Sequence, residues 1–202
     1  MKNHLPTTFI LSVKPVEYLT QGISHCGAYS VKAILSAFGK DDKKRPEEYH
    51  PNFFNRFTGL TLGKNYYSKI LNKYGIITEF KSAKNLPDVE KIGLLKTLLS
   101  ENVPIMIRIG NGYFRSKKYN PFLGKIINHW ITLWGYNDKK MVFYIYDSGL
   151  TKNLYDDVPI GNTKRTYDEI LRDWNFGTWQ FWTWHISLQN YVYIKINKKF
   201  SA

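Results

Sequence analysis

The spacing of apolar residues changes near the middle of the chain, and this change limits the possible folds more than any other feature. In the first half, apolar residues recur three and four positions apart, which predicts helices over 26–38, 63–74 and 88–99. The second half contains short runs rich in β-branched and aromatic residues, which predict strands at 103–109, 130–136, 141–146, 178–186 and 191–196. Helices followed by strands, with few alternating units, predict an α+β domain with a mainly antiparallel sheet.

Local signals set the ends of several predicted elements. Gly39 follows the first helical pattern, at a position where glycine commonly ends a helix. Pro87 precedes Asp88, which we expect to cap the third helix. The stretch Thr166-Tyr167-Asp168-Glu169 has the spacing of a capping box and predicts a short helix through Trp174.

The length of 202 residues suits a single domain. No apolar run approaches the roughly 18 residues that a membrane-spanning helix needs. The apolar stretch 9–11 is too short for the core of a secretion signal. We therefore expect a soluble protein without a membrane span, located in the cytoplasm.

The chain is strongly basic, with 29 Lys and Arg against 16 Asp and Glu, a net charge of +13. Such a charge favours anionic partners, whether nucleic acid, anionic lipid or an acidic substrate. The basic residues are spread along the chain and alternate with acidic ones at 40–48, so a solvated lysine-rich surface is the simpler interpretation. Nucleic acid is a weaker candidate, because zinc-finger spacing, an aromatic RNA-binding signature and a glycine-rich phosphate loop are all missing.

Cys26 is the only cysteine, which excludes an intramolecular disulfide and a zinc site built on several thiolates. No two histidines have helical ligand spacing, so we expect no metal and no cofactor. Cys26 stands where the first predicted helix begins, and the unpaired N–H groups and dipole of a helix N-terminus stabilise a thiolate. The alternative is a small, inert, buried residue at a helix start.

Two further residues could complete a nucleophilic site. His129 lies at the start of one predicted strand, and a histidine is the usual base for a thiol. Asp147 ends the next strand, although Asp-Ser-Gly is also ordinary turn chemistry. If 137–140 form the hairpin loop, His129 faces Ser148 and Asp147 faces Trp130, whereas a register one residue different places Asp147 opposite His129. A carboxylate there can orient the imidazole and stabilise its charged form.

Gln21 lies a few residues before Cys26. A side-chain amide can donate to the oxyanion that forms when a thiolate attacks a carbonyl. The alternative for a lone glutamine is a surface loop residue.

Gln21, Cys26, His129 and Asp147 follow one another along the chain in an order that resembles papain-like cysteine peptidases. The resemblance is greatest to the bacteriocin-processing, double-glycine-leader peptidase family and its stand-alone relatives. The resemblance is carried by QGISHCGAYSVKAIL at 21–35, NVPIMIRI at 102–109, HWITLWGYNDKKMVFYIYDSG at 129–149 and TYDEILRDW at 166–174. It implies one papain-like domain over 1–202, with a helical lobe at about 20–100 and a sheet lobe at about 101–200.

The resemblance also implies roles for individual residues. Cys26 would be the nucleophile, His129 the general base and then acid, and Asp147 the orienting group. Gln21 and the backbone N–H of Cys26 would form the oxyanion hole. The family glutamine usually lies six positions before the cysteine, whereas Gln21 lies five before it and Thr20 occupies the sixth position.

The sequence therefore predicts a cysteine-dependent hydrolase or acyl-transfer enzyme acting on a peptide or amide bond, with a peptide or protein as its substrate. A catalytically silent, peptidase-like module that binds a peptide is the alternative, and the displaced glutamine favours it.

Overall fold

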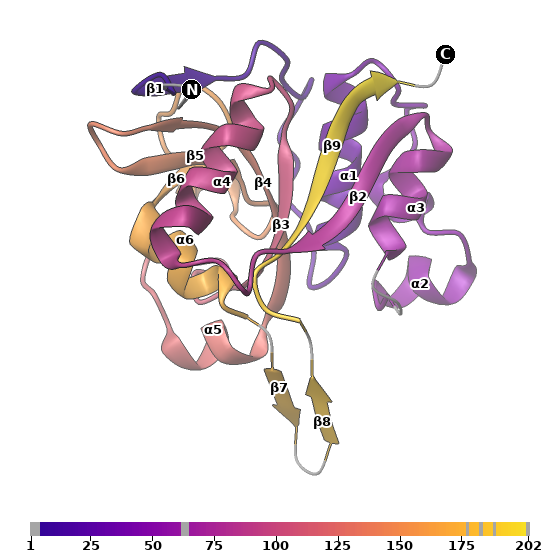
Figure 1. Ribbon diagram of the computed structural model, residues 1–202. Helices are drawn as coiled ribbons and strands as arrows, with labels where there is room; N and C mark the ends of the chain where they lie inside the picture. Colours follow the sequence, from indigo (N-terminus) through magenta and orange to yellow (C-terminus); the bar gives the residue numbers. More distant parts are fainter. Residues whose placement is uncertain (1–4, 62–64, 177, 182–183, 188, 201–202) are drawn as a thin grey trace.

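The computed structural model describes residues 5–61, 65–176, 178–181, 184–187 and 189–200. In this part of the chain, seven strands form one sheet in the order β2-β9-β3-β4-β5-β6, with β1 paired to β4 (Figure 1). The strands are β1 (Thr8–Ile10), β2 (Ile76–Ser82), β3 (Ile105–Gly110), β4 (Asn128–Asn137), β5 (Val142–Tyr146), β6 (Thr163–Thr166) and β9 (Val192–Phe200). Every pairing described is antiparallel, which confirms the predicted α+β class.

Helices cover both faces of this sheet. One core contains the apolar residues of α1 (Cys26–Ala37) and α3 (Tyr66–Lys73), packed on strand residues such as Met106 and Ile194. A second core contains those of α4 (Asp88–Ser100) and α6 (Tyr167–Trp174), packed on Ile107 and Ile131. In Figure 1, α1 and α3 lie toward the side of the picture that holds β9 and β2, and α4 and α6 toward the side that holds β5 and β6.

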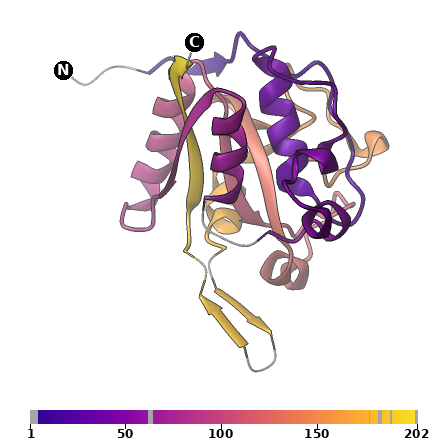
Figure 2. The ribbon, with the colours of Figure 1, turned by 90° about the vertical axis from the view of Figure 1, so that its right-hand side faces the viewer.

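The remaining elements are short. They are the helices α2 (Phe53–Thr58) and α5 (Pro121–Ile126), the 3-10 turns η1 (Pro46–Tyr49) and η2 (Lys152–Leu154), and the strands β7 (Thr178–Phe181) and β8 (Trp184–Ser187). The strands β7 and β8 pair only with each other in the described residues and project from the body of the molecule (Figures 1 and 2). The single strand predicted at 178–186 is therefore a hairpin.

One other expectation differs from the structure. Asp88 does not cap α4: Pro87 occupies the cap position without a side-chain hydrogen bond, and Asp88 is the first helical residue. Its carboxylate instead binds Lys91 Nζ at 2.8 Å, one turn further along. The first half, mostly helical as predicted, also contributes the strands β1 and β2 to the sheet. The division into lobes at 20–100 and 101–200 stays a prediction.

The capping box at the start of α6 forms as expected. Thr166 Oγ1 accepts from the N–H of Glu169 at 3.2 Å, and Glu169 Oε2 accepts from the N–H of Thr166 at 2.7 Å. These bonds satisfy backbone groups that a helix start leaves unpaired. Among the described residues, no helix combines the length and apolar character needed to cross a bilayer.

Candidate active site

Cys26 is the first residue of α1, as the sequence predicts. Its neighbour His25 occupies the cap position in the left-handed region, at φ 76°, and makes no side-chain cap bond. No acidic residue lies in the first turn. The half-buried thiol therefore stands beside the positive end of the helix dipole without a neighbouring carboxylate from its own helix to oppose it.

His129 and Asp147 form a buried pair. His129 Nε2 lies 2.7 Å from Asp147 Oδ1, and the two side chains are 1% and 0% exposed. The same oxygen accepts the N–H of Gly149 at 2.8 Å. The bond to Asp147 fixes the ring, so Nδ1 is the nitrogen left to face other groups.

Cys26 and His129 line the same cleft. Burial on its own would lower the pKa of His129, but the charges of Asp147 and then of Cys26 outweigh it and raise that pKa to about 9. Because Nε2 is bound to Asp147, Nδ1 is the ring nitrogen available to the thiol. The arrangement thus sets a thiol at a helix start in the same cleft as a buried, carboxylate-bound imidazole.

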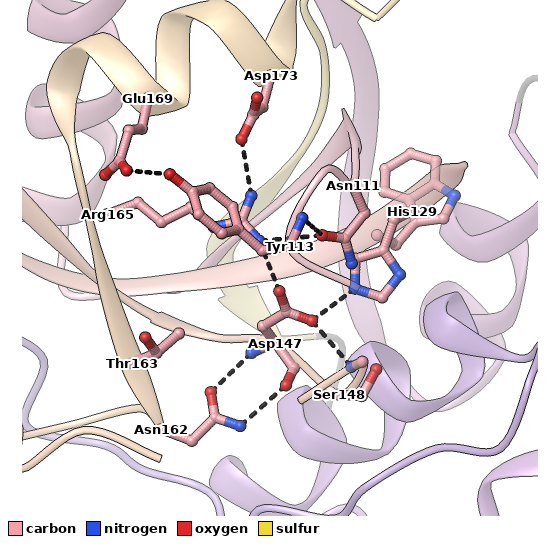
Figure 3. Close-up of polar contacts among 12 residues, drawn as sticks. Asn111, Tyr113, His129, Asp147, Ser148, Asn162, Thr163, Arg165, Glu169 and Asp173 are labelled. Carbon is pink, nitrogen blue, oxygen red and sulfur yellow. Dashed lines mark hydrogen bonds and ion pairs between the residues drawn. The ribbon is translucent and has the colours of Figure 1, made fainter. Parts of the chain in front are cut away.

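Asp147 is bound on both carboxylate oxygens (Figure 3). Arg165 Nη2 lies 2.7 Å from Oδ2, and Arg165 Nη1 lies 3.0 Å from the buried Asp173 on α6. Asn162 holds the backbone of Asp147 through two bonds, of 2.8 and 2.9 Å. Burial raises the pKa of Asp147, but His129 and then Arg165 outweigh it and lower that pKa to about 2. The carboxylate therefore stays charged.

Gln21 is buried beside the same site. Its Oε1 accepts the hydroxyl of Ser148 at 2.5 Å, and its backbone N–H donates to the Ser148 carbonyl at 2.8 Å. With Oε1 engaged, the amide NH₂ is the group that remains to donate. Thr20, at the position that usually carries the family glutamine, instead binds the Leu150 carbonyl and the Tyr155 hydroxyl through Oγ1.

A cleft of about 220 Å³ brings Gln21, Cys26 and His129 together. Its other lining residues are Ile23, Ser24, His25, Thr58, Gly59, Leu60, Thr61, Tyr67, Phe114, Ile127, Asn128 and Trp130. Tyr67 packs directly over Gly27, where a Cβ atom would overlap its ring. The thiol therefore opens to a space large enough for a few atoms of a substrate chain.

The route by which Asp147 reaches His129 differs from both predicted registers. Asn137 pairs with Val142, so the turn is 138–141 rather than 137–140. The register then shifts at a β-bulge between Leu133 and Gly135. Continuing the ladder past Tyr146, which pairs with Thr132, places Asp147 opposite Ile131. His129 is two residues further along the same strand face, so the two side chains meet on a diagonal.

The bulge is what makes this meeting possible. Without the extra residue at Trp134, the register near the turn would place Asp147 opposite Thr132, on the other face of the strand from His129. A one-residue shift moves every following side chain to the opposite face.

Sequence reasoning missed the residues that hold Asp147. Arg165 looks like part of an ordinary basic pair with Lys164, and Asn162 sits in a polar stretch. Their buried partners are 15 to 18 positions away in the chain. In β6 the side chains alternate, with Thr163 and Arg165 buried and Lys164 exposed, and this alternation turns the guanidinium inward.

Among the described residues, no group of three or more His, Cys, Asp or Glu side chains is arranged to hold a metal ion. The residue types of Cys26, His129 and Asp147 suit a nucleophile, a base and an orienting carboxylate.

Comparisons with known proteins found a family and a similar solved structure. Residues 10–174 match the model of the Peptidase_C39 like family. Among solved structures, the chain is similar to a double glycine motif protease from an AMS/PCAT transporter, determined in complex with the leader peptide. That likeness has a TM-score of 0.52 at 16% identity and covers 96% of this chain and 98% of the other, which shows a shared fold. No curated protein matches the chain.

Proposed function

Because the chain belongs to the Peptidase_C39 like family, we propose that it is a cysteine-dependent hydrolase or acyl-transfer enzyme. It acts on a peptide or amide bond through Cys26, His129 and Asp147. The observation that supports this most is geometric: Cys26 and His129 line one cleft, and the His129 ring is held there by the buried Asp147 at 2.7 Å. A thiol that shares a cleft with a carboxylate-bound imidazole is suited to nucleophilic chemistry.

In the proposed reaction, the Cys26 thiolate attacks the carbonyl carbon, and a carbon–sulfur bond forms. The carbon–nitrogen bond then breaks as His129 gives its proton to the leaving amine. Water or a second amine attacks the thioester while His129 takes up the proton, and the thiolate leaves. Asp147 holds the ring and stabilises its charge throughout.

Charge on the carbonyl oxygen needs donors that are already in place. We assign this role to the Gln21 amide NH₂ and the backbone N–H of Cys26. The Ser148 hydroxyl supports the assignment because it engages Gln21 Oε1 and so directs the donor half of the amide elsewhere. The displacement of Gln21 by one position in the sequence is compatible with this role, because Gln21 lines the cleft at Cys26.

The solved relative is a protease bound to its leader peptide. By analogy we propose a peptide or protein substrate for this chain. The test is a library of internally quenched peptides incubated with wild-type protein, Cys26→Ala and, as a matched control on the same helix, Ser36→Ala. Ser36 bonds only to the Ala33 carbonyl among the described hydrogen bonds of its side chain.

We expect cleavage by the wild type and by Ser36→Ala, and none by Cys26→Ala. A different result would favour a silent binding module: peptides retained equally by wild type and Cys26→Ala, with no product from either.

A further inference from the structure

The helix α2 has its aromatic side chains on the outside. Phe53, Phe54 and Phe57 are 82%, 59% and 78% exposed, and the rings of Phe53 and Phe57 stack 6.3 Å apart. The residue that α2 buries is polar: Asn55, whose side chain bonds to the Leu60 carbonyl. A helix of a globular protein normally buries its apolar face. This one shows the reverse arrangement.

The second short helix, α5, is similarly exposed. None of its residues is buried, and Phe122 is 67% exposed. Lys125 lies in its last turn, and Arg115 and Lys118 are exposed in the segment just before it, where Lys117 is paired with Asp156 at 2.7 Å. Apolar and basic side chains therefore share the surface of this helix.

The segments that carry these elements contain no acidic residue. Asp and Glu are missing from 49–78, which includes α2, from 102–137, which includes α5, and from 174–202, which includes β7 and β8. All 16 acidic residues lie elsewhere in the chain. The net charge of +13 is thus concentrated toward these three segments.

Short elements of these segments lie toward one end of the molecule, whereas β9 runs from there to the opposite end (Figure 1). Figures 1 and 2 both show α2, α5 and the β7–β8 hairpin toward the lower end. The cleft at Cys26 borders the same end, because 58–60 at the close of α2 and 127–128 just after α5 line it. Two exposed apolar side chains, Ile23 (87%) and Leu60 (60%), stand among its lining residues.

We propose that this end, defined by α2, α5 and the basic residues at 115–118 and 125, binds the surface of an anionic lipid bilayer. Exposed aromatic rings enter the interface between headgroups and acyl chains, and basic side chains are attracted to anionic headgroups. The phenylalanines of α2 do not line the cleft, so they are not placed to grip a peptide that occupies it. Bound in this way, the protein would meet its substrate at the membrane; that consequence alone rests on the proposed function.

The binding is tested with sucrose-loaded vesicles sedimented with the full chain. One set contains phosphatidylcholine alone, and the other equal parts of phosphatidylcholine and phosphatidylglycerol. The variants are Phe53→Ser/Phe57→Ser, Cys26→Ala and the control Val89→Ser. Val89 serves as the control because it is similarly exposed, at 85%, but is flanked by the acidic residues Asp88 and Glu90 on α4. Thermal unfolding of each variant checks that it folds.

We expect the wild type, Cys26→Ala and Val89→Ser to sediment equally with the anionic vesicles, more weakly as salt is added, and far less with phosphatidylcholine alone. The double phenylalanine variant should lose at least about tenfold in vesicle affinity. The proposal is overturned if the wild type stays in solution, or if the double variant, folded, binds as well as Val89→Ser. It is overturned equally if the wild type ignores both vesicles but binds single-stranded nucleic acid through the two phenylalanines.

Discussion

Arg165 donates to Oδ2 of Asp147 at 2.7 Å and thereby binds the carboxylate oxygen that His129 leaves free. Both side chains are almost fully buried, at 4% and 0% exposed. Buried charges are stable only when they are paired and hydrogen-bonded. The guanidinium is therefore a positioning group for the proposed site: it acts on the imidazole through Asp147.

Replacing Arg165 by Met leaves Asp147 and Asp173 without their shared cation. We expect the free energy of unfolding to fall by about 3–5 kcal/mol, and Arg165→Lys to recover part of it. The control Arg172→Met should cost less, because Arg172 also binds Asp173 but is 41% exposed. Urea unfolding at neutral pH measures the free energy of unfolding of the three variants.

The same substitution should move the pH profile of activity. Arg165 lowers the pKa of Asp147, so its loss raises that pKa and shifts the acid limb of kcat/KM to higher pH. If the unfolding free energy of Arg165→Met falls while its acid limb stays in place, the residue is purely structural; Arg165→Lys, which keeps the charge, should leave the limb close to that of the wild type.

Protonation of His129 should stabilise the fold. Its pKa is raised from 6.5 to about 9, so its stabilising effect is complete below about pH 6.5 and is lost as the pH rises through about 9. The difference in unfolding free energy between wild type and His129→Gln should therefore shrink by about 2–3 kcal/mol from pH 6 to pH 10. Denaturant titrations of both proteins between pH 6 and pH 10 measure this difference. A difference that does not change with pH would contradict the pairing of a protonated His129 with Asp147.

If Gln21 is the oxyanion donor, substitutions of Gln21 and of its neighbour Thr20 should have different effects. Gln21→Ala should lower kcat by about 10²–10³ while leaving the fold intact, because a preorganised donor is lost. Thr20→Ala should cost about 1 kcal/mol of stability from its bonds to Leu150 and Tyr155 and leave kcat almost unchanged. Equal losses of kcat in the two variants would show that Gln21 is not the donor.

The contact of Gly27 on α1 with Tyr67 on α3 positions a side chain that lines the cleft. A Cβ at Gly27 would overlap the Tyr67 ring, which also packs edge-on to Trp130 at 5.6 Å. We expect Gly27→Ala to cost about 1–3 kcal/mol by overpacking. Gly93→Ala on α4, where a Cβ meets open space, should stabilise by about 0.5–1 kcal/mol. Thermal unfolding compares the two, and a Gly27→Ala protein as stable as wild type would mean that Tyr67 can move aside.

Local patterns were sufficient to predict the longer elements. The apolar spacing at 26–38 and 88–99 corresponds to α1 and α4, and the capping box corresponds to α6. These elements form from contacts within a few residues, which a sequence displays directly. The sequence analysis does not predict the six-residue helices α2 and α5, because they bury almost no apolar surface and therefore show no periodic apolar pattern.

Features that depend on tertiary structure were not predictable in the same way. The bulge near Trp134 and the positive φ of Met141 set the β4–β5 register, and neither follows from residue type. The ion pair of Arg165 with Asp147 joins residues 18 positions apart across two strands. The family resemblance could point to Cys26, His129 and Asp147, but not to the groups that hold them.

The claim that Cys26 is activated by His129 is tested most directly by the rate at which iodoacetamide alkylates the thiol near pH 6.5, in wild type and in His129→Ala. Iodoacetamide reacts with the thiolate, and loss of the neighbouring imidazolium removes the charge that stabilises it. We predict a rate at least about tenfold higher in the wild type. Equal rates in the two folded proteins would contradict the account.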